Sequence, residues 1–146
     1  MSSEYLTDEE YEAYWVKLEE VRSVISRDLG LTEGMRILDV GTGWGFFAIE
    51  MAKQLKRGKI VGIDISLEGI NRARKFVREA EATDIIQIRR MDATKLSFPD
   101  RYFDLAVSFL GMRDIYMTGE KRGVKNTVKE MIRVTKPDGK IALCVI

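Results

Sequence analysis

Ile37-Leu38-Asp39-Val40-Gly41-Thr42-Gly43-Trp44-Gly45 is the stretch that decides the fold, because an apolar run typical of a β-strand ends there in a dense glycine turn. A helical pattern follows from Phe46. Glycine adopts positive φ and lacks a Cβ, so the backbone of such a turn can approach a ligand closely. The start of the helix adds unpaired N–H groups and the positive end of the helix dipole. Strand, turn and helix in this order predict a cradle for a nucleotide-like ligand.

The spacing of the glycines narrows the choice of ligand. The dinucleotide fingerprint G-x-G-x-x-G/A ends in a small residue that lets the helix pack tightly against the strand. Here the glycines are Gly41, Gly43 and Gly45, and Phe46 occupies the place of that last small residue. The spacing therefore argues against a pyrophosphate-binding turn and against an NAD-dependent oxidoreductase. The remaining alternative is a purely structural turn between a strand and a helix.

Length and composition indicate one globular domain, with 146 residues of which 45% are hydrophobic and 32% charged. The net charge of +1 creates no strong field toward nucleic acid or membranes. The chain has no histidine and a single cysteine, Cys144, which excludes imidazole chemistry and a disulfide framework and predicts no metal site. No signal peptide or membrane-spanning run is recognisable, so a cytoplasmic location is expected.

The first thirty residues are predicted to form an amphipathic helix, and residues 31–146 the domain itself. Thr7 and Glu10 have the spacing of a capping box, and Gly30 is a plausible end. Apolar residues recur between them at helical spacing: Tyr11, Tyr14, Trp15, Leu18, Val21 and Ile25. This face is expected to pack on the domain. The alternative is a lid over the ligand, with Tyr11, Tyr14 or Trp15 near a substrate.

Strands and helices alternate along the rest of the chain. Helices are predicted over residues 46–58, 66–82 and 124–134, with an irregular segment at 111–119 and a turn at 137–139. The predicted strands are residues 36–40, 59–64, 85–91, 103–109 and 140–146. This alternation predicts an α/β fold, with a mostly parallel, Rossmann-like doubly wound sheet and helices on both faces.

Carboxylates end three of these strands, where the ligand of such a sheet binds. Asp39, Asp64 and Asp92 stand at these ends. Asp64 follows Gly45 by nineteen residues, and at that distance its carboxylate can accept hydrogen bonds from both hydroxyls of a ribose. The alternative for Asp64 is an acid that stabilises the start of the helix capped by Ser66.

The pair Asp92-Ala93 is interpreted as an adenine site. The carboxylate of Asp92 can accept a hydrogen bond from the amino group of adenine, and the backbone N–H of Ala93 can reach a ring nitrogen. The alternative is an acid in an Asx turn. Ile65 is placed to pack on the adenine face, or else belongs to the core.

Together these motifs resemble class I S-adenosylmethionine-dependent methyltransferases, from about residue 33 to the end of the chain. The resemblance is closest to the small-molecule and quinone-type branch, and it implies the strand order 3-2-1-4-5. The matching segments are residues 38–45, 61–66, 92–99, 103–108 and 131–140. Family members usually continue past the fifth strand with a helix and an antiparallel strand pair, which are lacking here.

The resemblance implies methyl transfer from S-adenosyl-L-methionine to a small-molecule acceptor. Asp64 would hold the ribose, and Asp92 with Ala93 the adenine. The methionyl part of the cofactor would lie against Asp39 and the turn residues Gly41, Thr42, Gly43, Trp44 and Gly45. A sulfonium is an activated leaving group, so the protein mainly aligns the acceptor with the methyl group.

The sequence indicates the residues around the acceptor less directly than those around the cofactor. If the acceptor must lose a proton, the candidates for the base are Asp114, Tyr116 and Tyr11. Arg113 is a candidate for orienting an acidic substrate, beside Tyr14 and Trp15. The alternative for Arg113 and Asp114 is a solvated ion pair.

Two other functions remain open at this point. One is a cofactor-binding subunit that needs a partner for catalysis. The other is an RNA methyltransferase, suggested by two basic groups in which acids are interspersed, without the aromatic platform that single strands require. These groups are Arg72, Arg74, Lys75 and Arg78, and Lys121, Arg122 and Lys125. A nucleic acid substrate is therefore not expected.

The last predicted strand, from Lys140 to Ile146, is apolar on both of its faces. Such a strand belongs inside a covered sheet and not at a bare edge. We expect either that the chain is a fragment of a longer polypeptide or that another chain, most simply a second copy, covers this edge.

Overall fold

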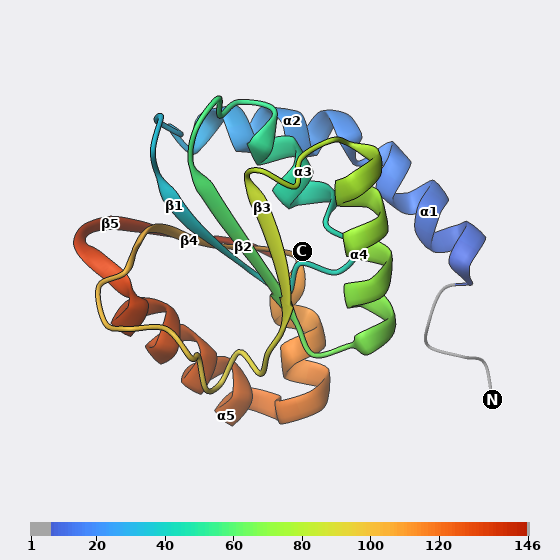
Figure 1. The fold of residues 1–146 in the computed structure, drawn as a ribbon. Coiled ribbons are helices and arrows are strands. Elements are labelled where there is room, and N and C mark those ends of the chain that lie inside the picture. Colours follow the sequence, from blue (N-terminus) through green and yellow to red (C-terminus); the bar gives the residue numbers. More distant parts are fainter. Residues whose placement is uncertain (1–6, 146) are drawn as a thin grey trace.

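The computed structural model describes residues 7–145, apart from five side chains in two of its helices, those of Tyr11, Trp15, Arg113, Asp114 and Thr118 (Figure 1). Its centre is a parallel sheet with the order β3-β2-β1-β4-β5. The strands are β1 (Arg36–Val40), β2 (Lys59–Asp64), β3 (Ile86–Arg90), β4 (Phe103–Phe109) and β5 (Thr135–Cys144). The predicted fold class and strand order are confirmed.

Helices cover both faces of the sheet (Figure 1). Helices α2 (Glu19–Asp28), α3 (Phe46–Ala52) and α4 (Leu67–Glu79) lie on one face, and α5 (Gly111–Val134) lies on the other. Helix α1 (Asp8–Lys17) extends from α2 beside α4. None of the described helices is long and apolar enough to cross a membrane.

The central strand β1 shows why its sequence reads as a nearly unbroken apolar run. Ile37 packs into the core beneath α3 and α4, while Leu38 and Val40 pack into the core beneath α5. All three side chains are fully buried. A parallel strand with helices over both faces selects apolar residues at nearly every position; the exceptions are Arg36, exposed at the start of the strand, and the buried Asp39.

The N-terminal helix is correctly predicted at its start and only in part in its buried face, where Ile25 packs against the core as expected. The capping box is present, because the Glu10 N–H donates to Thr7 Oγ1 and the Thr7 N–H donates to Glu10 Oε2. The helix is interrupted at Leu18, so α1 and α2 are separate. Val21 is exposed, and the residues that α2 buries include the polar pair Arg22 and Ser26.

These two polar residues pack on α3. The Arg22 guanidinium lies 5.3 Å from the centre of the Phe46 ring, and Ser26 Oγ accepts a hydrogen bond from the Gln54 amide. The hydrophobic pattern misleads here because the surface that α2 covers offers an aromatic face and an amide, which suit polar partners.

Helix α5 begins earlier than the sequence predicts. Residues 111–119, expected to be irregular, are helical, and Glu120 (φ 53°, ψ −154°) marks a kink between two helical parts. The segment is rich in glycine and lacks an apolar period, so propensity alone argues against a helix there. At the other end, β5 begins at Thr135, ahead of the predicted turn.

That predicted turn at residues 137–139 is an irregularity inside β5. Thr135 pairs with Phe103 and Lys140 pairs with Leu105, so four residues of β5 stand opposite Asp104 alone. Lys136 Nζ lies 2.8 Å from Asp104 Oδ1 and ties the bulge to β4.

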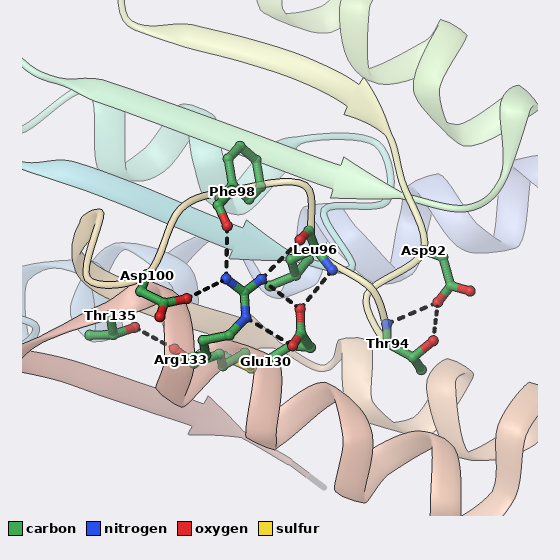
Figure 2. Close-up of polar contacts among 9 residues, drawn as sticks. Asp92, Thr94, Leu96, Phe98, Asp100, Glu130, Arg133 and Thr135 are labelled. Carbon is green, nitrogen blue, oxygen red and sulfur yellow. Dashed lines mark hydrogen bonds and ion pairs between the residues drawn. The ribbon is translucent and has the colours of Figure 1, made fainter.

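Arg133, near the end of α5, holds the loop that follows β3 (Figure 2). Its guanidinium donates to the carbonyl oxygens of Leu96 and Phe98, both at 2.9 Å. It also pairs with Glu130 and Asp100, each at 2.8 Å. These bonds raise the pKa of Arg133 and lower that of Glu130. The same loop carries Asp92 and Ala93 at its start, so Arg133 helps to position them.

We expect Arg133→Lys to lower the free energy of unfolding by about 1–3 kcal/mol, because an ammonium cannot reproduce the five hydrogen bonds of the planar guanidinium. Urea denaturation followed by circular dichroism measures the change. Arg78→Lys, at an exposed position of α4, serves as the control and should change stability by less than about 0.5 kcal/mol. Equal effects of the two substitutions would show that the loop does not depend on Arg133.

Candidate functional site

A cavity of about 320 Å³ lies at the carboxyl ends of β1, β2 and β3, where α5 closes it. This is the edge at which ligands bind in parallel α/β sheets. Its wall is formed by Gly41, Ile63, Asp64, Ile65, Met91, Asp92, Ala93, Thr94, Gly111, Ile115, Gly119, Gly123 and Thr127. Five of the predicted cofactor residues are thereby brought together, namely Gly41, Asp64, Ile65, Asp92 and Ala93.

The glycine turn has the left-handed backbone that its sequence indicates. The φ angles of Gly41, Gly43 and Gly45 are 70°, 55° and 85°. A Cβ on Gly41 would lie 2.9 Å from the Cα of Gly111, so the turn touches the start of α5 backbone to backbone. A side chain at residue 41 is therefore excluded both by conformation and by space.

Asp64 joins the turn to the helix that follows β2. Its Oδ2 accepts a hydrogen bond from the Gly43 N–H at 3.0 Å, and its Oδ1 accepts one from the Ser66 N–H, also at 3.0 Å. The expected cap is also formed, because Ser66 Oγ accepts from the Gly69 N–H at 3.1 Å. The role of Asp64 at the helix start is thus real. It does not compete with ligand binding, since each carboxylate oxygen has a second lone pair.

Asp39 carries an unsatisfied acceptor. The side chain is 1% exposed; its Oδ2 accepts a hydrogen bond from Thr42 Oγ1 at 2.8 Å, while its Oδ1 has no partner among the described residues. Burial raises the pKa of Asp39 to about 7. The negative charge of Asp64 raises this pKa further, and the hydrogen bond from Thr42 lowers it. A buried carboxylate oxygen without a donor suits a ligand that brings a donor or a positive charge.

Thr42 and Trp44 brace the turn from outside the cavity. Besides its bond to Asp39, Thr42 donates its N–H to the Ile63 carbonyl at 2.8 Å. The Trp44 ring stacks on Phe76 at 5.9 Å, and the Arg72 guanidinium lies 4.4 Å from its centre. Direct contact of either side chain with a cofactor stays a prediction.

Asp92 forms the Asx turn that was the alternative for it. Its Oδ1 accepts from the Thr94 N–H at 2.9 Å and from Thr94 Oγ1 at 2.7 Å, and these bonds lower its pKa. Figure 2 shows the second carboxylate oxygen directed away from Thr94. Ile65 is 58% exposed on the cavity wall, so its alternative assignment to the core is wrong.

Of the residues predicted to contact the acceptor, those whose side chains are described do not line this cavity. Tyr116 is 49% exposed and does not line the cavity, and Tyr14 is half-exposed on α1. The side chains of Tyr11, Trp15, Arg113 and Asp114 lie outside the described ones, so their roles stay predictions, as does the lid. Within the described part of the chain, no group of three or more acids or cysteines is arranged to hold a metal ion.

Sequence reasoning missed the wall that α5 supplies. Ile115, Gly119, Gly123 and Thr127 all line the cavity, and the last three recur every four residues. A spacing of four residues indicates one face of a helix, although α5 is kinked at Glu120, between Gly119 and Gly123. It was hidden because residues 111–119 were interpreted as irregular.

Comparison with known proteins places the chain among methyltransferases. A family model described as a methyltransferase domain matches residues 37–139. The chain is 29% identical over 123 residues to a demethylmenaquinone methyltransferase of Lactobacillus johnsonii, covering 84% of the chain and 48% of that protein. It is 32% identical over 110 residues to a phosphatidylethanolamine N-methyltransferase of Cereibacter sphaeroides, covering 75% of the chain and 50% of that protein.

The chain thus spans about half the length of these curated relatives. Among solved structures, a SAM-dependent methyltransferase from Aquifex aeolicus superimposes with a TM-score of 0.72 at 27% identity. The match covers 87% of the chain and 65% of that structure.

The buried Asp39 predicts a pH dependence of stability. Folding raises its pKa from 3.8 to about 7, so the unfolded chain loses this proton first as pH rises. The contribution of Asp39 therefore makes the protein less stable between about pH 4 and pH 7, with no further change above that range. Asp39→Asn cannot ionise and should remove this part of the profile.

Urea denaturation at about pH 5 and pH 8 measures this difference. The stability of the Asn variant relative to wild type should increase with pH. Asp28→Asn, exposed at the end of α2, is the control and should follow wild type. Parallel profiles for wild type and Asp39→Asn would contradict the raised pKa.

Proposed function

The chain belongs to the methyltransferase domain family, and on that premise we propose that it transfers a methyl group from S-adenosyl-L-methionine to a small-molecule acceptor. The observation that carries the proposal is the cavity at the carboxyl edge of the sheet, with Asp64 and Asp92 on its wall. Asp39, whose carboxylate has an unsatisfied oxygen, lies near the end of β1, the strand that pairs with β2.

The residues present suit this cofactor part by part. The unpaired Oδ1 of Asp39 would accept a hydrogen bond from the methionyl ammonium, which removes an unsatisfied buried acceptor. Asp64 would accept from the ribose hydroxyls through its remaining lone pairs. Asp92 would take the adenine amino group on the oxygen that faces away from Thr94, with Ala93 N–H beside it, and Ile65 would cover the ring.

When bound, the cofactor supplies a methyl group on a positively charged sulfur, which is already an activated leaving group. The contribution of the chain is to orient the acceptor and to exclude water, for which effective molarities of about 10⁵–10⁸ M set the scale. Helix α5 is suited to this task because Gly111 and Ile115 both line the cavity. Arg113 and Asp114 lie between them in the chain, and we keep them as the proposed residues for orienting the acceptor and accepting its proton.

A small-molecule acceptor is favoured over nucleic acid. The names of the two curated relatives specify demethylmenaquinone and phosphatidylethanolamine, which are both small molecules. The cavity wall is partly apolar through Ile63, Ile65 and Met91. Transfer of a radiolabelled methyl group to these two compounds by the purified chain tests the activity, with RNA as the comparison acceptor. Labelling of RNA alone would overturn the small-molecule assignment.

We predict that Asp64→Ala weakens the binding of S-adenosylhomocysteine about tenfold to a hundredfold, which corresponds to about 1.5–3 kcal/mol for hydrogen bonds to a charged group. Isothermal titration calorimetry measures the dissociation constant, and circular dichroism checks the fold, since Asp64 also holds two backbone N–H groups. Glu79→Ala, exposed on α4, is the control acid. An unchanged dissociation constant would leave Asp64 with its structural role only.

We further propose that a second polypeptide, most simply a second copy of the chain, covers the outer edge of β5. Beyond Lys140 the strand carries no charge that would discourage pairing, and Ile141, Leu143 and Val145 are between 38% and 67% exposed. An open edge with apolar side chains favours pairing with another strand.

Light scattering should therefore detect a dimer or a larger species, and Val145→Lys should shift it toward monomer because a charge is placed at the paired edge. Hydrogen exchange supplies the check. A stable monomer in which the amides of residues 142–145 exchange slowly would contradict pairing between chains.

A further inference from the structure

Thr127 is a buried threonine whose hydroxyl has no protein partner. Its side chain is 0% exposed in the second part of α5, and Oγ1 accepts and donates no hydrogen bond within the described part of the chain. Thr135, directly after the same helix, behaves as a buried threonine normally does, because its Oγ1 donates to the Met131 carbonyl at 2.6 Å. A buried hydroxyl without a partner is costly, so its presence needs an explanation.

The explanation lies in what Thr127 faces, because it lines the cavity with the two glycines that precede it on the helix. A Cβ built at Gly119 meets none of the described atoms within 4 Å, and one at Gly123 meets Ile115 only at ordinary contact distance. Thr127 therefore lines the cavity on a stretch of wall where the two glycines leave space, although its hydroxyl is buried in this structure. Figure 1 shows α5 beginning beside the carboxyl ends of the strands, with its second part running along one face of the sheet.

The other polar side chains of the wall are already engaged. Asp64 holds the glycine turn, and Asp92 and Thr94 hold each other. Opposite α5 the sheet offers the apolar side chains of Ile63 and Met91. Among the described lining residues, Thr127 is thus the polar side chain whose hydrogen-bonding capacity is wholly unused.

We propose that the Thr127 hydroxyl donates a hydrogen bond to a ring nitrogen of the adenine of the bound cofactor, from the α5 wall. The proposal rests on the proposed function, which places adenine between Asp92, Ala93 and Ile65. Adenine has three ring nitrogens that accept hydrogen bonds, and Ala93 N–H can serve one of them. A hydroxyl donor on another wall serves a second, so that Thr127 becomes a specificity-determining residue for the purine.

This role gives Thr127 a signature that a packing threonine lacks. Valine has nearly the same shape as threonine and no hydroxyl. Thr127→Val should therefore make the free protein more stable, because an unsatisfied polar group is removed, and should weaken ligand binding, because a donor to the ligand is lost. A threonine that only packs predicts no loss of affinity.

The experiment compares three variants with wild type by urea denaturation and by calorimetry with S-adenosylhomocysteine. Thr127→Val should raise the unfolding midpoint and raise the dissociation constant about threefold to tenfold. Thr127→Ser keeps the hydroxyl and should bind within about twofold of wild type. Thr135→Val is the matched control: it loses a bond within the protein, so its stability should fall while its affinity stays unchanged.

A second measurement identifies the nitrogen. Wild type and Thr127→Val are titrated with adenosine and with its 1-, 3- and 7-deaza analogues, each of which lacks one ring nitrogen. For one analogue the loss of affinity seen in wild type should vanish in Thr127→Val, because the two changes remove the same hydrogen bond.

The outcomes separate this inference from its premise. Wild-type affinity of Thr127→Val for S-adenosylhomocysteine, or additive losses with every deaza analogue, would overturn the role of Thr127 and leave the cofactor assignment intact. Failure of wild type to bind either S-adenosylhomocysteine or adenosine would overturn the proposed function, and the role of Thr127 with it.

Discussion

The contact between Gly41 and Gly111 is the constraint on which the site depends. Strands β1 and β4 are parallel neighbours at the centre of the sheet, so the segments that leave them emerge side by side. A Cβ on Gly41 would lie 2.9 Å from Gly111 Cα, and a Cβ on Gly111 would lie 2.8 Å from the Val40 carbonyl oxygen. Only two glycines allow this approach, which brings α5 against the glycine turn and closes the cavity.

The charges around this contact act together. Asp39 and Asp64 stand at the ends of adjacent strands, and the charge of Asp64 adds to the effect of burial in raising the pKa of Asp39. Two neighbouring carboxylates, one of them buried, are a poor environment for an anion and a good one for a cation. This distinguishes the site from a pyrophosphate cradle and agrees with the absence of a small residue at position 46.

The sequence predicts the parts of the fold and the site whose burial produces a local pattern, and it misses those whose burial depends on residues distant in the chain. The sheet and the carboxylates at its edge were predicted correctly because β1 and β2 are buried on both faces, and such strands are recognisable as apolar runs that stop at a charge. The beginning of α5 was not predicted, because the glycines that line the cavity there lower the helix propensity of the segment. Arg22 and Thr127 were missed because their burial depends on partners distant in the chain, which no local period reports.

We propose that the carboxyl edge of the sheet, bounded by the glycine turn and α5, holds S-adenosyl-L-methionine. The most direct test is the change of amide ¹H–¹⁵N chemical shifts when S-adenosylhomocysteine is added to the protein. We expect the largest changes at Gly43, Asp64 and Ala93, and little change at Gly58, which lies at the amino-terminal edge just before β2. Unchanged spectra, or changes centred on Gly58, would contradict it.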